Sequence, residues 1–170
     1  MNISHAISVQ GWMSPVELNF LAETAAKSKR IVEIGSYKGR SACAMAPNTE
    51  GTIWCVDIWS ECGTDGWFYD VFRSHTARYS NVIPVNRSSI WAAREFAESG
   101  MTFDFIFIDA AHDRFNVRQD IAAWRPLLAP GGVFAGHDYA FKDWPDVKTI
   151  VDEMVPKHRI IDTIWVAEEG

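Results

Sequence analysis

The sequence predicts an α/β fold in which a doubly wound, mostly parallel sheet carries helices on both faces. Five apolar, β-like runs alternate with helical patterns along the 170 residues, and three of these runs end in an acidic residue. Such alternation is typical of parallel sheets, whose successive strands are joined by crossover helices. The length allows one substantial core, and no repeat or linker divides it, so we expect a single domain over residues 1–170.

Helix signals mark the first half of the chain. Ser14-Pro15-Val16-Glu17 is a capping box with proline at the first helical position, and Pro47 ends a later helix. Between these signals lie short apolar runs rich in β-branched residues. We therefore expect, in order, a helix over 15–27, a strand over 30–34, a helix over 40–46, a strand over 53–58, a polar loop over 59–66 and a helix over 67–79.

The second half continues the alternation. Pro84 places its strand at an edge of the sheet, because proline cannot donate a hydrogen bond to a strand ladder. Ser89 and Asp146, or a neighbour of Asp146, are expected to cap helices. The elements expected here are a strand over 81–86, a helix over 90–98, a strand over 103–109, a helix over 115–124, a turn over 127–132, a strand over 133–137, a helix to about 155 and a hairpin of 158–162 with 164–167.

Composition excludes several classes of partner. The net charge is −6, and no basic cluster exceeds Lys27-Ser28-Lys29-Arg30, so neither nucleic acid nor an anionic membrane surface is expected as a partner. No run of 18 apolar residues is present. The three cysteines lack CxxC spacing and look like thiols of a reducing compartment. We expect a cytoplasmic protein.

A strand–turn–helix stretch over residues 30–41 predicts a ligand site. Glu33 is an acid within a strand that is otherwise apolar, and Gly35 and Gly39 permit close backbone approach in the following turn. Ligands of open α/β sheets bind just beyond the carboxyl ends of the strands. Asp57, 22 positions after Gly35, has the spacing of an acid that binds ribose hydroxyls. The dinucleotide fingerprint, however, needs a second glycine where Tyr37 stands, which disfavours a dehydrogenase.

These residues resemble the class I S-adenosylmethionine-dependent methyltransferases. The stretch Val32-Glu33-Ile34-Gly35-Ser36-Tyr37-Lys38-Gly39 looks like the first motif of that family, and Asp57 stands at its ribose-binding acid. The runs 106–109 and 127–132 match later motifs, and the terminal hairpin matches the reversed last strand. The resemblance covers residues 11–167 and implies a seven-stranded, Rossmann-like sheet.

The resemblance also implies which residues bind S-adenosylmethionine. Glu33 and the turn after it would meet the methionine part, and Asp57 would bind the ribose. Ser88 stands where the family often has an aspartate against the adenine amine. The residues placed at the cofactor are Glu33, Gly35, Ser36, Tyr37, Gly39, Asp57, Ile58, Ser88 and Asp109.

Four polar side chains follow the strands over 103–109 and 133–137, namely Asp109, His112, His137 and Asp138. These strands are neighbours in the expected fold, so the four groups would converge at one edge and form a metal or acid–base site. Two carboxylates suit Mg²⁺, whereas an imidazole ligand from His137 shifts the preference toward Mn²⁺ or Zn²⁺.

This pattern resembles the metal-dependent O-methyltransferases, most closely the branch that modifies sugars and antibiotics. By that resemblance Asp109 and Asp138 hold the metal, with His137 in place of the first member of the usual acidic pair. His112 is the base, a role that suits an imidazole near neutral pH. The expected reaction is metal-assisted methylation of a hydroxyl on a small molecule or sugar, with Asp109 positioning that hydroxyl.

Two alternatives stay open. The chain has almost no insertion beyond the core, so it could be an S-adenosylmethionine-binding protein without transferase activity. It could also be a metal-independent methyltransferase. Only the loop over 59–69 and the first dozen residues are available to cover a substrate, unless a second subunit completes the site, which leaves a homo-oligomer open.

Overall fold

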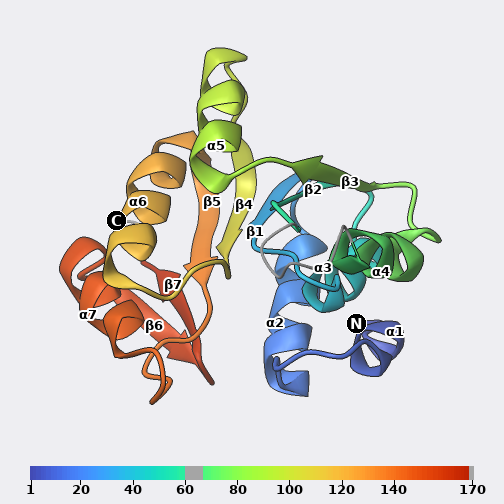
Figure 1. Ribbon diagram of the computed structural model, residues 1–170, viewed down its shortest axis with the longest axis horizontal. Helices are drawn as coiled ribbons and strands as arrows, with labels where there is room; N and C mark the ends of the chain where they lie inside the picture. The colour runs from blue at the N-terminus through green and yellow to red at the C-terminus, as the bar shows by residue number, and fades with distance from the viewer. Residues whose placement is uncertain (60–66, 169–170) are drawn as a thin grey trace.

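The computed structural model describes residues 1–59 and 67–168, which form one seven-stranded sheet (Figure 1). Its strands are β1 (Arg30–Ile34), β2 (Thr52–Asp57), β3 (Val82–Asn86), β4 (Phe103–Ile108), β5 (Leu128–Gly136), β6 (His158–Ile161) and β7 (Ile164–Ala167). The order across the sheet is β3-β2-β1-β4-β5-β7-β6. Strands β1 to β5 run parallel, and β7 is antiparallel to β5 and β6. The predicted fold class, with its reversed terminal strand, is confirmed.

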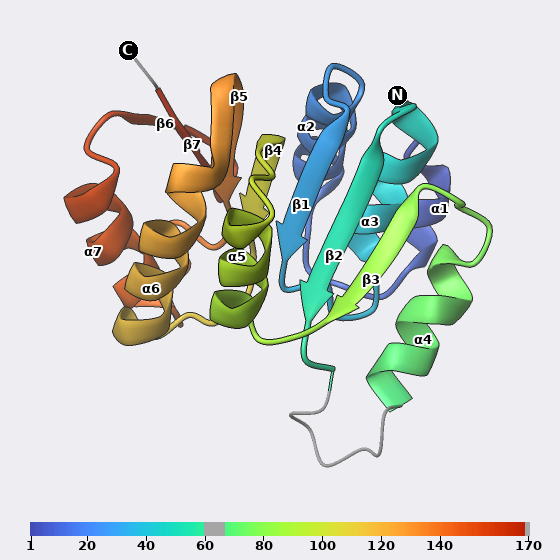
Figure 2. The same ribbon diagram turned by 90° about the horizontal axis from the view of Figure 1, so that it is seen from above.

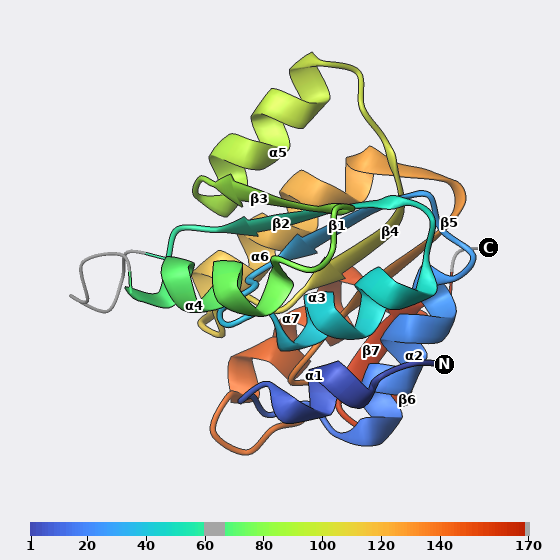
Figure 3. The same ribbon diagram turned by 90° about the vertical axis from the view of Figure 1, so that its right-hand side faces the viewer.

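Helices cover both faces of the sheet, as Figures 2 and 3 show. One layer contains α1 (Ser4–Ser8), α2 (Pro15–Ala25), α3 (Arg40–Met45) and α4 (Trp67–Thr76), and the other contains α5 (Ser89–Glu98), α6 (Arg114–Trp124) and α7 (Pro145–Met154). Two single 3-10 turns, η1 (Ala46–Asn48) and η2 (Arg125–Leu127), follow α3 and α6. None of the helices within residues 1–59 and 67–168 has the length and apolar character that a membrane span requires.

Strand β1 shows why the sheet is buried between two cores. Residues 31–34 are all buried, as expected of a parallel strand covered on both sides. Ile31 packs in the core below α2 and α3, whereas Val32 and Ile34 pack in the core shared with α5 and α6. Because side chains alternate along a strand, Glu33 points to the same side as Ile31, toward α3.

Several predicted boundaries are confirmed and others are wrong. The capping box of Ser14 and Glu17 begins α2, and Pro84 lies in the edge strand β3. Helix α5 begins at Ser89, so the N-cap position belongs to Ser88, which makes no side-chain cap. Asp146 does not cap α7 either: Trp144 holds that position, while Asp146 accepts a hydrogen bond from the main chain of α6. The predicted loop over 59–66 lies outside the described residues except for its first member.

The turn after β1 is held against the end of β4. Gly35 has φ +86° and donates its N–H to the carbonyl of Val56 at 2.9 Å, and the N–H of Asp109 bonds the carbonyl of Ile34 at 2.7 Å. A Cβ atom built on Gly35 would lie 2.1 Å from the carbonyl oxygen of Asp109. Only glycine permits this approach, which brings the ends of three strands together around one space.

Candidate active site

A cavity of about 810 Å³ lies at the carboxyl ends of the parallel strands. Its volume is in the range of small-molecule binding sites. The walls come from the N-terminal segment, the turn after β1, and the loops that follow β2, β3, β4 and β5. Of the residues expected at the site, those that line the cavity are Gly35, Ser36, Tyr37, Asp57, Ile58, Ser88, Asp109, His112, His137 and Asp138. Glu33 and Gly39 are not among the lining residues.

Asp57 fixes the turn after β1 from the end of β2. Its Oδ2 accepts the N–H groups of Ser36 at 2.9 Å and Tyr37 at 2.8 Å, and its Oδ1 accepts that of Trp59 at 2.8 Å. A carboxylate has about four lone-pair sites, so three backbone donors leave room for one further donor from a ligand. The same side chain therefore shapes the turn and faces the cavity.

Glu33 lies beneath that turn rather than in the cavity wall. It is fully buried, and its carboxylate accepts hydrogen bonds from the hydroxyls of Ser36 at 2.5 Å and of Ser41. Burial raises the pKa of Glu33 to about 7, although the two serine hydroxyls act in the opposite direction. Gly39, with φ +86°, begins α3 above Phe72. Both residues thus support the turn after β1.

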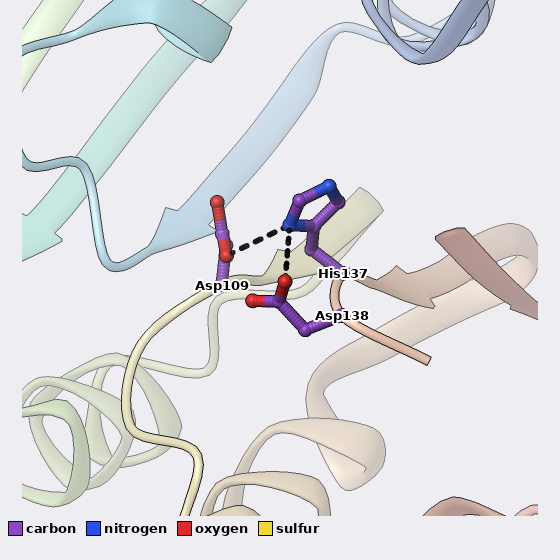
Figure 4. A group of neighbouring side chains, drawn as sticks. All are labelled: Asp109, His137 and Asp138. Atoms are coloured by element: carbon purple, nitrogen blue, oxygen red, sulfur yellow. Dashed lines mark ion pairs between the residues drawn. The ribbon is translucent and has the colours of Figure 1, made fainter. Parts of the chain in front are cut away.

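Asp109, His137 and Asp138 converge at the ends of β4 and β5 (Figure 4). Nδ1 of His137 lies 3.4 Å from Oδ1 of Asp109 and 3.3 Å from Oδ1 of Asp138, while its other ring nitrogen points away from both carboxylates. One ligand atom from each of the three residues lies within 4.8 Å of the others. Burial alone would lower the pKa of His137, but the surrounding carboxylates raise it to about 12. The raised pKa favours a positively charged ring between these carboxylates.

The donor set also fits a divalent cation. Two carboxylates and an imidazole are ligands that Mn²⁺ and Zn²⁺ accept, and a metal-bound histidine usually donates its other N–H to a carboxylate. His137 meets this requirement, because its Nε2 lies 3.2 Å from Oε1 of Glu17. A proton and a metal would compete for Nδ1 of the same ring.

His112 is held on two sides. Its Nε2 lies 2.8 Å from Oδ2 of Asp138, and the Trp144 ring stacks on the imidazole with centroids 4.5 Å apart and planes 16° from parallel. Burial alone would raise the pKa of Asp138, but hydrogen bonds from His112 and His137 lower it, so this side chain is a carboxylate. A carboxylate only accepts, so Nε2 of His112 carries the proton and Nδ1 is left to accept one.

The N-terminal segment over residues 10–14 forms another wall, and the turn after β1 holds it in place. Arg40 follows Gly39, and its guanidinium group donates to the main-chain carbonyl of Met13 within the segment and to those of Ala6, Ile7 and Val9 just before it. Lys38 Nζ donates to the side chain of Gln10 at 2.7 Å. This leaves Trp12 80% exposed beside the cavity. The predicted cover over 59–69 lies largely outside the described residues.

Two residues of the site were missed by the sequence analysis. Glu17 was recognised only as half of a capping box, although it also reaches His137. Arg40 carried no local signal, because the carbonyl groups that it binds lie about 30 positions away in the chain. Asp113, by contrast, caps α6 and has no place in the cavity wall.

Comparison with known proteins agrees with this geometry. Residues 32–139 match the sequence model of a family described as a methyltransferase domain. The fold is similar to that of an O-methyltransferase from Bacillus cereus in complex with SAH, with a TM-score of 0.72, 20% identity, and coverage of 96% of this chain and 86% of that one. Among curated proteins, none is significantly similar in sequence.

Two further solved structures share the fold. CalS11, a TDP-rhamnose 3′-O-methyltransferase of calicheamicin biosynthesis, has a TM-score of 0.67 and 15% identity over 90% of this chain and 77% of that one. The cofactor-bound Rv0187 from MTB has a TM-score of 0.73 and 18% identity over 96% of this chain and 85% of that one. The family match spans both the turn after β1 and the ends of β4 and β5. The chain belongs to the class I S-adenosylmethionine-dependent methyltransferases.

Proposed function

We propose that the protein transfers a methyl group from S-adenosylmethionine to a hydroxyl of a small molecule or sugar, assisted by a divalent cation. The observation that carries this proposal is the meeting of two groups in one cavity: the His112–Asp138 pair and the set of Asp109, His137 and Asp138. Similar structures include O-methyltransferases, one of which acts on TDP-rhamnose, and these support a hydroxyl as the acceptor.

The cofactor half of the cavity is formed by the turn after β1 and by Asp57. When bound, S-adenosylmethionine supplies an electrophilic methyl group, and a divalent cation at Asp109, Asp138 and His137 would supply polarisation of the acceptor hydroxyl. The backbone of Gly35, Ser36 and Tyr37 faces the cavity beside Asp57, which offers its remaining acceptor position to a ribose hydroxyl. Ser88 lies at the end of β3, where it can hydrogen-bond an adenine.

His112 accepts the proton of the acceptor hydroxyl in the proposed reaction. Asp138 accepts the Nε2–H of this ring, so Nδ1 receives the proton as the oxygen attacks the methyl group. The resulting imidazolium is stabilised by the carboxylate of Asp138 at 2.8 Å. Trp144 packs against the ring face and limits its rotation. Asp109 lies at the cavity wall, where it can orient the hydroxyl.

A second candidate is the same transfer without metal. It is favoured by His137, whose pKa is raised to about 12 and whose Nδ1 lies between Asp109 and Asp138. In that case the imidazolium takes the place of the cation. It would offset one of the two carboxylate charges without polarising the acceptor.

Chelation distinguishes the two candidates. Purified protein is treated with EDTA, exchanged into metal-free buffer and assayed with a panel of hydroxyl acceptors before and after addition of Mg²⁺ or Mn²⁺. The metal-assisted reaction predicts loss of methyl transfer and recovery on addition. Activity that is indifferent to both steps contradicts the role of metal and supports the second candidate. S-adenosylmethionine binding without transfer to any acceptor would favour a binding protein.

A further inference from the structure

The carboxylate of Glu17 is almost fully enclosed beside His137 and is not one of the proposed ligands of the cation. Its side chain is 3% exposed and comes from the first turn of α2. Oε2 accepts the N–H of Ser14 at 2.8 Å and so completes the capping box. Oε1 is directed elsewhere, toward the β6–β7 turn and the end of β5. One carboxylate thus connects three parts of the fold.

The donors around Oε1 determine the protonation of His137. Oε1 accepts the main-chain N–H of Thr163 at 3.0 Å and its hydroxyl at 2.6 Å. Both oxygens of Glu17 therefore accept main-chain N–H groups, that of Ser14 on Oε2 and that of Thr163 on Oε1, as the oxygens of a carboxylate do. A carboxylate only accepts, so Nε2 of His137, 3.2 Å from Oε1, donates a hydrogen to this oxygen.

This contact also sets the direction of the ring. The two nitrogens of an imidazole are separated by one carbon and direct their hydrogen or lone pair away from each other. Fixing Nε2 on Glu17 therefore aims Nδ1 at the space between Asp109 and Asp138. Without Glu17, a buried Nε2–H would lose its partner, and the ring could turn or change tautomer. Thr163 reinforces the arrangement, because its two donors hold Oε1 in position.

We propose that Glu17 is a positioning residue that keeps the proton of His137 on Nε2 and presents Nδ1 to the cation position between Asp109 and Asp138. The cation position rests on the proposed function, whereas the placement of the proton does not. The hydrogen bonds of Glu17 go to Ser14, Thr163 and His137 and not to the turn after β1, so its effect is expected on the β4–β5 side of the cavity. Removing such an outer carboxylate from a metal-bound histidine typically weakens metal binding by about 10- to 100-fold.

Metal affinity gives the first test. Mn²⁺ binding is measured by EPR for wild type, Glu17→Gln and Glu23→Gln, with SAH affinity measured in parallel by calorimetry. We expect Glu17→Gln to bind Mn²⁺ about 10- to 100-fold more weakly with unchanged SAH affinity. Glu23→Gln makes the same chemical change at an exposed residue of the same helix that does not line the cavity. This control should bind Mn²⁺ as wild type does.

The ring of His137 gives a second test that needs no Glu17 variant. Long-range ¹H–¹⁵N spectra of histidine-labelled wild type, assigned with His137→Asn, report which nitrogen carries the proton. We expect Nε2–H, with Nδ1 unprotonated when Mg²⁺ is bound. An unprotonated Nε2, or equal Mn²⁺ affinity in wild type and Glu17→Gln, overturns the inference. If wild type binds no Mn²⁺, the cation role of Glu17 and the metal-assisted function are overturned together. The placement of the His137 proton on Nε2 is then tested by the spectra alone.

Discussion

Nε2 of His112 lies 2.8 Å from Oδ2 of Asp138, and the other oxygen of the same carboxylate lies 3.3 Å from Nδ1 of His137. Asp138 therefore connects the proposed base with the proposed cation position. Its backbone has φ +62°, a left-handed conformation that a non-glycine residue adopts at a cost and that is often found at functional sites. Base and cation position thus share one rigid support at the end of β5.

Trp144 should matter for the rate and not for cofactor affinity. Trp144→Leu keeps an apolar side chain but removes the stacking on His112, which for aromatic pairs is worth about 0.5–1.5 kcal/mol. We expect kcat to fall by up to about tenfold, with the Kd for SAH unchanged in calorimetry. Trp91→Leu, on the exposed side of α5, serves as the control and should change neither value. An unchanged kcat in Trp144→Leu would contradict the role of Trp144 in holding the ring of His112.

Replacement of Asp57 by asparagine, the amide of the same size, should weaken binding of the cofactor. All three of its partners are backbone N–H donors, distributed over both oxygens. Asp57→Asn places an NH₂ group against at least one of them, and hydrogen bonds to a charged group are worth about 1.5–3 kcal/mol. We expect SAH affinity to fall by at least about tenfold in calorimetry. Wild-type affinity in this variant would mean that the turn after β1 is held by other contacts.

Gly35 and Gly100 form a matched pair for backbone strain. Both have positive φ, but a Cβ on Gly35 meets the carbonyl of Asp109 at 2.1 Å, whereas a Cβ on Gly100 meets nothing within 4 Å. Gly100→Ala should lower the free energy of unfolding by about 1–2 kcal/mol, the cost of a left-handed residue. Gly35→Ala should lower it by at least about 3 kcal/mol, because steric overlap is added. Urea denaturation of both variants measures the difference, and equal losses would contradict the close approach of β1 and β4.

Glu33 should make stability depend on pH. Its folded pKa, about 7, lies above the ordinary value of 4.5 for a glutamate, so the folded state holds the proton more tightly than the unfolded state. The contribution of Glu33 to stability is therefore greatest below about pH 4.5 and falls as the pH rises toward 7, by on the order of 3 kcal/mol.

Glu33→Gln lacks this titration and is the natural comparison. Urea denaturation of wild type and Glu33→Gln at pH 5 and pH 8 should show wild type losing stability relative to the variant at the higher pH. A difference between the two proteins that is independent of pH would show that the carboxyl is ionised throughout, with Ser36 and Ser41 stabilising its charge.

The fold could be predicted because its signals are local. Alternating apolar strands, the capping box at Ser14 and the edge proline Pro84 each act within a few residues. Helix α1 was missed because it is five residues long and has no side-chain cap. Strand β5 was expected to begin at Val133, but it begins at Leu128, which pairs with Phe103 of β4. The register between the two strands shifts after this pair and is regular from the pair of Phe105 and Val133 onward.

Only those residues of the site that directly follow the ends of strands could be predicted from the sequence. Asp109, His137 and Asp138 meet because parallel neighbours end at one edge, which the order of the strands already implies. The contact of Glu17 with Thr163 spans 146 positions and depends on how α2 lies across the end of β5. Glu33 is predicted to meet the cofactor, and the additional support that its side chain gives to the turn after β1, through the hydroxyls of Ser36 and Ser41, had no signal in the sequence.

The central claim is that His112 accepts the proton during methyl transfer to oxygen. Single-turnover transfer from S-adenosylmethionine carrying a labelled methyl group is measured for wild type and His112→Ala with a hydroxyl acceptor, together with SAH affinity. The account predicts an O-methyl product, a rate that falls by about 10²- to 10⁴-fold in the variant, and unchanged SAH affinity. Transfer at the wild-type rate by His112→Ala would contradict it.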